Sequence, residues 1–217
     1  MTFLGLIFVI ISMDSPLLGL WTGRKHKGHY LWVFCLCSFM WDYFSSILRY
    51  HFHYNIMWLG NFWTIVEFIT ISYFISSALM LSRKATLGLI IGGLTVYFLV
   101  FSPLNFNEWN AYGSAIFSLS YIVLSILVFR KLMLDLESKN ILHSFTFWVT
   151  LAFFMYASLN FFVFVMMKTI YGADPKTFGK IWTLVFTTSN ITKNVLISVG
   201  FSYLTKITID DKVRYSR

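Results

Sequence analysis

Residues 56–79 read IMWLGNFWTIVEFITISYFISSAL, an apolar run with a single charged residue, Glu67, near its middle. Because a helix rises 1.5 Å per residue, about 20 residues cross the roughly 30 Å of bilayer hydrocarbon. A charge at the centre of such a span costs at least about 2.5–3.5 kcal/mol and is rarely left facing lipid. A second apolar run, residues 181–203, carries Lys193 at a matching depth. The two runs therefore predict a buried Glu67–Lys193 ion pair inside a helix bundle.

The composition is that of a membrane protein. Of 217 residues, 58% are hydrophobic and 12% charged, whereas a soluble domain carries about 25% charged residues. The net charge of +8 comes from short basic clusters between apolar runs, so it indicates membrane topology and not nucleic-acid binding. Cys35 and Cys37 are two positions apart and would lie on different helix faces, so we expect neither a disulfide nor a metal site.

Seven apolar runs predict an all-α, seven-transmembrane-helix bundle, since helices satisfy their own backbone in lipid. The predicted helices are 2–21, 30–48, 56–79, 85–101, 111–129, 145–170 and 181–203. The bundle would occupy residues 1–203 and a short cytoplasmic tail residues 204–217. Most lysines and arginines fall in the first, third and fifth loops and in the tail, which predicts an outside N-terminus and a cytoplasmic C-terminus.

Local breaks and small residues predict details of two helices. Asp14, with Ser15 and Pro16, is expected to bend and cap a broken first helix. The fourth helix is the shortest, and its glycines predict close packing against a neighbour. These glycines are Gly88, Gly92 and Gly93.

Polar residues accompany the two buried charges at helical spacing, which predicts a polar stripe on each helix. They are Asn61, Thr64, Asn190 and Asn194. One interpretation is a hydrogen-bonded network that fixes helix register. The other is a hydrated central cavity that binds a ligand, an ion or a proton. The sequence leaves both open.

Asp42 is a further acidic residue within a predicted span. Ser38, Ser45 and Ser46 lie three or four residues from it, so hydroxyls are expected around the carboxylate. Asp42 would either be solvated just below the outer headgroups or line an outward vestibule leading to Glu67.

The chain offers little chemistry of other kinds. No hydrolase, zinc-protease, phosphate-loop or DNA-binding motif occurs, so we predict no catalytic residues. His51 and His53 lack a nearby third ligand, so no metal is expected. A lysine on the last helix opposite an acid on the third also occurs in retinal proteins. Retinal on Lys193, with Trp148 and Tyr156 in an aromatic cage, is therefore kept as an alternative.

Two motifs carry a family resemblance. Residues 61–68 read NFWTIVEF and residues 189–194 read SNITKN. They resemble the Y-T-x-x-E-F and S-x-x-N-I-x-K-N segments of an uncharacterised family of small bacterial seven-transmembrane-helix integral membrane proteins. At residues 186–188 this chain has FTT, where that family has a histidine. The resemblance implies that Asn160 belongs to the same pattern as the central pair, and that the protein lies in the bacterial inner membrane.

We therefore expect a non-enzymatic, multi-pass inner-membrane protein that senses a ligand or supports a partner. Besides the lipid bilayer, the expected partner is a membrane or cytoplasmic protein, or a second copy of the chain. A small-solute, ion or proton transporter is the alternative, and a lipid-modifying enzyme is a third hypothesis. The expected central polar site comprises Glu67, Lys193, Asn61, Thr64, Asn190, Asn194, Asp42 and Asn160.

Overall fold

The computed structural model describes residues 3–27, 29–52, 57–100, 109–135 and 141–215. This part of the chain consists of helices and short connections without a strand, so the predicted all-α class is confirmed. The α-helices are α1 (Phe3–Asp14), α2 (Pro16–Thr22), α3 (Tyr30–His51), α4 (Met57–Ala78), α5 (Arg83–Val100), α6 (Ala111–Asp135), α7 (Phe145–Ala173) and α8 (Pro175–Tyr215).

Within the described ranges, five helices, α3 to α7, are long and apolar enough to cross a membrane. They correspond to the second to sixth predicted runs. The first predicted run is divided into α1 and α2, of which the segment Val9–Thr22 is apolar but short. The last run lies inside the more polar α8. That helix continues to Tyr215, so most of the expected tail is part of it.

The break between α1 and α2 falls at Ser15, as predicted. Proline has no N–H and cannot continue the helical hydrogen-bond ladder, so the helix restarts at Pro16. The Ser15 hydroxyl donates to the carbonyl of Ser12 at 2.7 Å. The expected capping by Asp14 is wrong, because its carboxylate instead accepts a hydrogen bond from the Tyr43 hydroxyl on α3 at 2.6 Å.

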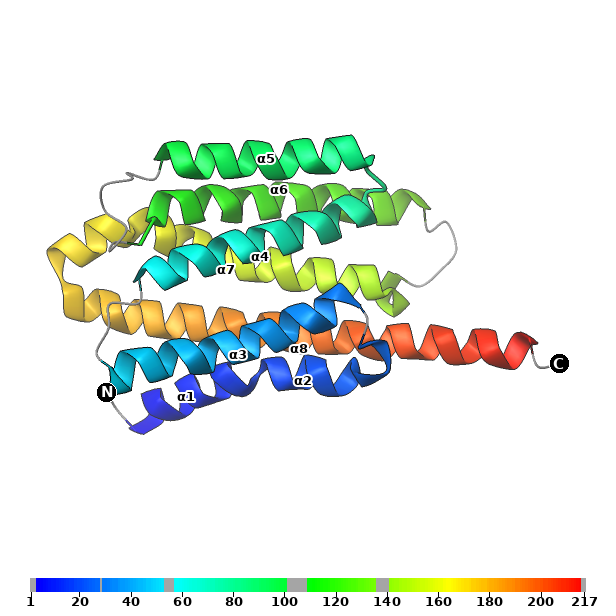
Figure 1. The fold of residues 1–217 in the computed structure, drawn as a ribbon, viewed down its shortest axis with the longest axis horizontal. Coiled ribbons are helices and arrows are strands. Elements are labelled where there is room, and N and C mark those ends of the chain that lie inside the picture. The colour runs from blue at the N-terminus through cyan, green and yellow to red at the C-terminus, as the bar shows by residue number, and fades with distance from the viewer. Residues whose placement is uncertain (1–2, 28, 53–56, 101–108, 136–140, 216–217) are drawn as a thin grey trace.

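The helices run roughly along one direction (Figure 1). α5 lies at one edge of the bundle, and α1 and α2 lie at the other. α8 packs against α7 on one side and against α1 and α2 on the other, and its C-terminal part extends past the ends of its neighbours. α4 contacts α3, α5, α6 and α7, so it lies in the interior of the bundle.

Only one of the three glycines of α5 packs closely. A Cβ at Gly93 would collide with the ring of Phe68 on α4, which itself stacks on Phe117 of α6 at a centroid distance of 3.8 Å. A Cβ added at Gly88 or Gly92 would meet no described atom of a neighbouring helix within 4 Å. The expectation of close packing is therefore right for Gly93 and wrong for the other two, which lie on the open side of an edge helix.

The turn from α7 to α8 is held by Asp174. Its carboxylate accepts hydrogen bonds from the Thr177 hydroxyl at 2.5 Å and from the main-chain N–H of Lys176 at 2.9 Å. These bonds favour the ionised form, the Thr177 hydroxyl first, and so lower the pKa of Asp174. The turn places the start of α8 over the end of α7, where a cavity begins.

Candidate functional site

The predicted ion pair between α4 and α8 is present. Lys193 Nζ lies 2.9 Å from Glu67 Oε1, and the two side chains are 2% and 7% exposed. α4 and α8 are not tightly packed against each other in the described part of the chain. The two long side chains reach across the space between the helices. An isolated buried charge is very costly, so each residue needs the other.

Tyr156 of α7 completes the charged cluster. Its hydroxyl donates to Glu67 Oε2 at 3.2 Å, so both carboxylate oxygens are hydrogen-bonded. Lys193 Nζ also lies 4.1 Å from the centroid of the Tyr156 ring and 5.6 Å from that of Phe34, within reach of cation–π attraction. The cluster of Glu67, Lys193 and Tyr156 is thus tied together from three helices.

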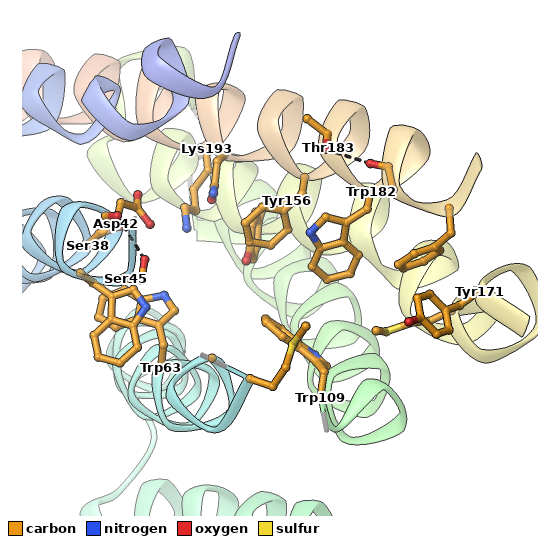
Figure 2. Close-up of a pocket in the computed structure, with 18 residues that line it drawn as sticks. Ser38, Asp42, Ser45, Trp63, Trp109, Tyr156, Tyr171, Trp182, Thr183 and Lys193 are labelled. Atoms are coloured by element: carbon orange, nitrogen blue, oxygen red, sulfur yellow. Dashed lines mark hydrogen bonds between the residues drawn. The ribbon is translucent and has the colours of Figure 1, made fainter. Parts of the chain in front are cut away.

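A cavity of about 410 Å³ leads to this cluster. It extends from Tyr171 and Phe178 near the α7–α8 turn to Tyr156 and Lys193, and α3 and α4 form its other walls (Figure 2). Aromatic side chains dominate the lining, with tryptophans at positions 41, 63, 109 and 182. The two tryptophans of α3 and α4 stack on each other with centroids 5.2 Å apart.

Asp42 lies in the wall of the cavity, which leads to the Glu67–Lys193 pair. Ser38 and Ser45 line the cavity beside it, and its side chain is directed toward Lys193 in Figure 2. The Ser45 hydroxyl donates to the main-chain carbonyl of Asp42 at 3.1 Å and not to the carboxylate. Among the described residues, the Asp42 carboxylate has no hydrogen-bond or ion-pair partner.

Two predicted polar residues of α4 lie away from this cavity. Asn61 is buried, and its Oδ1 accepts hydrogen bonds from the N–H of Asn110 at 2.9 Å and the hydroxyl of Tyr97 at 3.4 Å. It therefore joins α4 to α5 and to the start of α6. Thr64 donates to the carbonyl of Gly60 and lines a separate space of about 30 Å³ next to Glu67. Six helical positions rotate Asn61 well away from the face of Glu67, so the expected continuous stripe divides.

The asparagines near Lys193 divide in the same way. Asn190, three positions before Lys193, lines the cavity. Asn194, one position after it, points to another face and donates to the Ser15 hydroxyl at 2.7 Å. Asn160 donates from Nδ2 to the Ser189 hydroxyl, which joins α7 to α8. Of the expected site residues, Glu67, Lys193, Asp42 and Asn190 therefore gather around the cavity and its inner end. Asn61, Asn160 and Asn194 connect helices, and Thr64 bonds within α4 beside the smaller space.

The sequence placed Tyr156 near Lys193 only as part of an aromatic cage for retinal, and it did not predict the hydrogen bond from Tyr156 to Glu67 or the tryptophans that line the cavity. Tyr156 lies four residues before Asn160, on the same helix face, but nothing in the sequence shows that its hydroxyl bonds Glu67. Trp148 was expected beside Tyr156 in an aromatic cage. It lies in the first turn of α7, away from the cavity, and donates to the carbonyl of Leu142. The one available signal was the unusual depth of Trp41 and Trp63 within their spans.

The histidines and cysteines give no metal site in the described residues. No group of three His, Cys, Asp or Glu side chains is close enough there to hold a metal ion. His53 and the side chain of His51 lie outside what the structure describes. Cys35 is buried and Cys37 exposed, and both are free thiols.

Comparison with known proteins gives no match to a family, to a curated protein or to a solved structure. The candidate site therefore has to be interpreted from its own geometry.

Proposed function

We propose that this protein is a non-enzymatic membrane receptor that binds a small ligand in the aromatic cavity and passes the signal to a partner protein. The observation that carries the proposal is the cavity of about 410 Å³ that reaches the buried Glu67–Lys193 pair. Ligand pockets are typically apolar clefts of about 300–1,000 Å³ with a few convergent polar groups. Here those groups are Asp42, Asn190 and Lys193.

The proposed topology has seven crossings in a bacterial inner membrane, with α1 and α2 together as the first crossing and α8 as the seventh. The basic clusters support an outside N-terminus and a cytoplasmic C-terminus. In this orientation the cavity opens toward the outside. The family resemblance of residues 61–68 and 189–194 is part of the same proposal and agrees with this arrangement.

α8 is the proposed route from ligand to partner. It carries Lys193 at the inner end of the cavity and continues as one helix beyond the rest of the bundle (Figure 1). A ligand that alters the contacts of Lys193 would change how α8 packs against α7. A helix that leaves the bundle offers that change to a cytoplasmic or membrane partner.

The cavity can be blocked by one substitution with a matched control. Thr183 lines the cavity on α8, whereas Thr188 on the same helix is exposed and does not line it. We expect Thr183→Trp to abolish ligand-induced thermal stabilisation and Thr188→Trp to preserve it. The measurement is a thermal-shift screen of a small-molecule library on purified protein. Stabilisation by the same compounds in wild type and in both variants would contradict a receptor site in this cavity.

Transport is the second candidate, supported by a second cavity of about 350 Å³ near the other end of the bundle. Phe74 of its lining packs against Phe153 with centroids 5.9 Å apart, and Phe153 packs against Phe34. Phe34 in turn stacks on Trp63, which lines the first cavity. If these rings separate two access routes, the protein reconstituted in liposomes should carry a flux of a small solute, an ion or protons. The Glu67→Gln variant should carry a smaller flux. Flux that is insensitive to Glu67→Gln would remove the transport hypothesis.

A further inference from the structure

We infer that the aromatic cavity recognises an organic cation, such as a small quaternary or alkyl ammonium compound. This inference rests on the proposed function, because it assigns a ligand class to the same cavity. It is based on two observations: the Asp42 carboxylate in the cavity wall has no cationic partner of its own in the described part of the chain, and aromatic rings dominate the lining.

In the ranges that the structure describes, the cavity and the cluster at its inner end contain two carboxylates, Glu67 and Asp42, but one lysine, Lys193, which pairs with Glu67. Glu67 and Lys193 neutralise each other at 2.9 Å, and Tyr156 hydrogen-bonds the second oxygen of Glu67. The carboxylate of Asp42 has no such partner among the described residues, although it lies in the cavity wall. Asp42 is half-buried, so its carboxylate is only partly solvated and gains from an opposite charge close by. A cation in the cavity supplies the missing partner of Asp42.

The rest of the lining suits the same ligand. The aromatic ring face is the negative part of its quadrupole, and cages of such rings are the usual recognition element for quaternary ammonium groups. Trp41 and Trp63 form one aromatic group beside Asp42. Trp109, Trp182 and Phe186 form a second group, with Trp182 centroids 5.4 Å from Trp109 and 5.2 Å from Phe186. Figure 2 shows Trp63 on one side of the cavity and Trp109 and Trp182 on the other.

An anionic ligand fits the same space poorly. The ammonium of Lys193 already contacts Glu67 and lies over the Tyr156 ring, so an anion must displace a carboxylate to reach it. The anion would then stand near two carboxylates, those of Glu67 and Asp42. Displacing a buried partner and adding like charges both oppose binding.

The test compares ligands of matched shape and different charge. The full chain is purified in the uncharged detergent dodecyl maltoside, because choline lipids would compete. Probes are choline, its uncharged carbon isostere dimethylbutanol, the anion dimethylbutyrate, and the tetraalkylammonium series. Binding is read from the fluorescence of the cavity tryptophans. We expect at least one ammonium probe to bind saturably, and choline to bind at least about tenfold tighter than its uncharged isostere.

Asp42→Asn should weaken ammonium binding at least about tenfold and leave binding of the uncharged isostere unchanged. Asp14→Asn is the matched control, since Asp14 lies on α1 and bonds Tyr43 outside the cavity. It should bind the ammonium probes as wild type does. Circular dichroism and gel filtration check that each variant is folded.

Three results would overturn the inference. They are no binding by any ammonium probe, equal or tighter binding of the isostere or the anion, and full ammonium binding by folded Asp42→Asn. A cavity that takes uncharged or anionic compounds would leave the proposed receptor function intact. That function is decided separately by the Thr183→Trp comparison.

Discussion

The carboxylate of Glu67 is hydrogen-bonded at both oxygens, by Lys193 of α8 and Tyr156 of α7. These contacts join three helices through one side chain. Their contribution to stability is revealed by replacing Glu67 or Lys193 singly and together. Removing one charge strands the other, whereas removing both does not.

We therefore expect Glu67→Gln and Lys193→Met to lower stability by about 3 kcal/mol each, because breaking a buried pair costs about 3–5 kcal/mol. The double variant should lose less than the sum and less than either single variant. Thermal melting of the purified protein in detergent measures all three. Additive losses would mean that the two residues do not interact.

Tyr156→Phe distinguishes the contribution of the Tyr156 hydroxyl to stability from that of its ring. The variant keeps a ring under the ammonium of Lys193 but leaves Glu67 Oε2 without its donor. We expect a loss of about 2 kcal/mol, the value of a hydrogen bond to a charged group. Tyr73→Phe is the control, because Tyr73 is exposed on α4. Equal melting temperatures for the two variants would show that the Tyr156 hydroxyl makes no such bond.

The pair could be predicted from the sequence because two isolated charges lie at matching depths in two apolar runs. The remaining polar residues could not be assigned to a side of their helix with the same certainty. Asn61 and Asn194 are near the charges in sequence but face α6 and α2, and only the packing of those helices reveals it. The lack of a hydrogen bond from the described residues to the Asp42 carboxylate was likewise not predictable, because Ser45 and Ser46 bond other atoms.

Between helices, α5 packs closely on α4 at Gly93, where the Phe68 ring occupies the space that a Cβ would need. An added methyl group must push the ring or the helix aside. Overpacking of this kind costs about 1–3 kcal/mol. On the open side of α5 the same change meets nothing.

We expect Gly93→Ala to lower the melting temperature, while Gly92→Ala leaves it unchanged or raises it. Alanine favours a helix over glycine by about 1 kcal/mol, and Gly92 has no neighbour for the methyl group to strike. Thermal melting of the two variants side by side is the measurement. A stabilised Gly93→Ala variant would show that α5 is not packed on Phe68.

Helix positions were predictable where an apolar run ends in charged or polar residues. The run at 145–170 corresponds to α7, and the run at 56–79 to α4, with small changes at the ends. The full length of α8 was not predictable from hydropathy, because a helix that leaves the bundle needs no apolar face. The break at Ser15 was predictable, since Pro16 removes a hydrogen-bond donor.

Across the whole molecule, the cavities of about 410 Å³ and 350 Å³ near opposite ends of the bundle give a test of orientation. Ser45 lines the cavity that contains Asp42, and Ser77 lines the cavity near the other end. In a Cys37→Ser background, Ser45→Cys should react with a charged, membrane-impermeant thiol reagent in intact cells. Ser77→Cys should react only in inverted vesicles. The reverse pattern would reverse the proposed orientation.

The receptor proposal depends on a buried pair at the end of an aromatic cavity, and an experimental map of the bundle centre in lipid nanodiscs tests this most directly. We predict that Lys193 Nζ lies within hydrogen-bonding distance of Glu67, with the cavity open beside Asp42. A map that places either side chain against lipid, or separates them beyond the reach of a bridging water, would contradict the central claim.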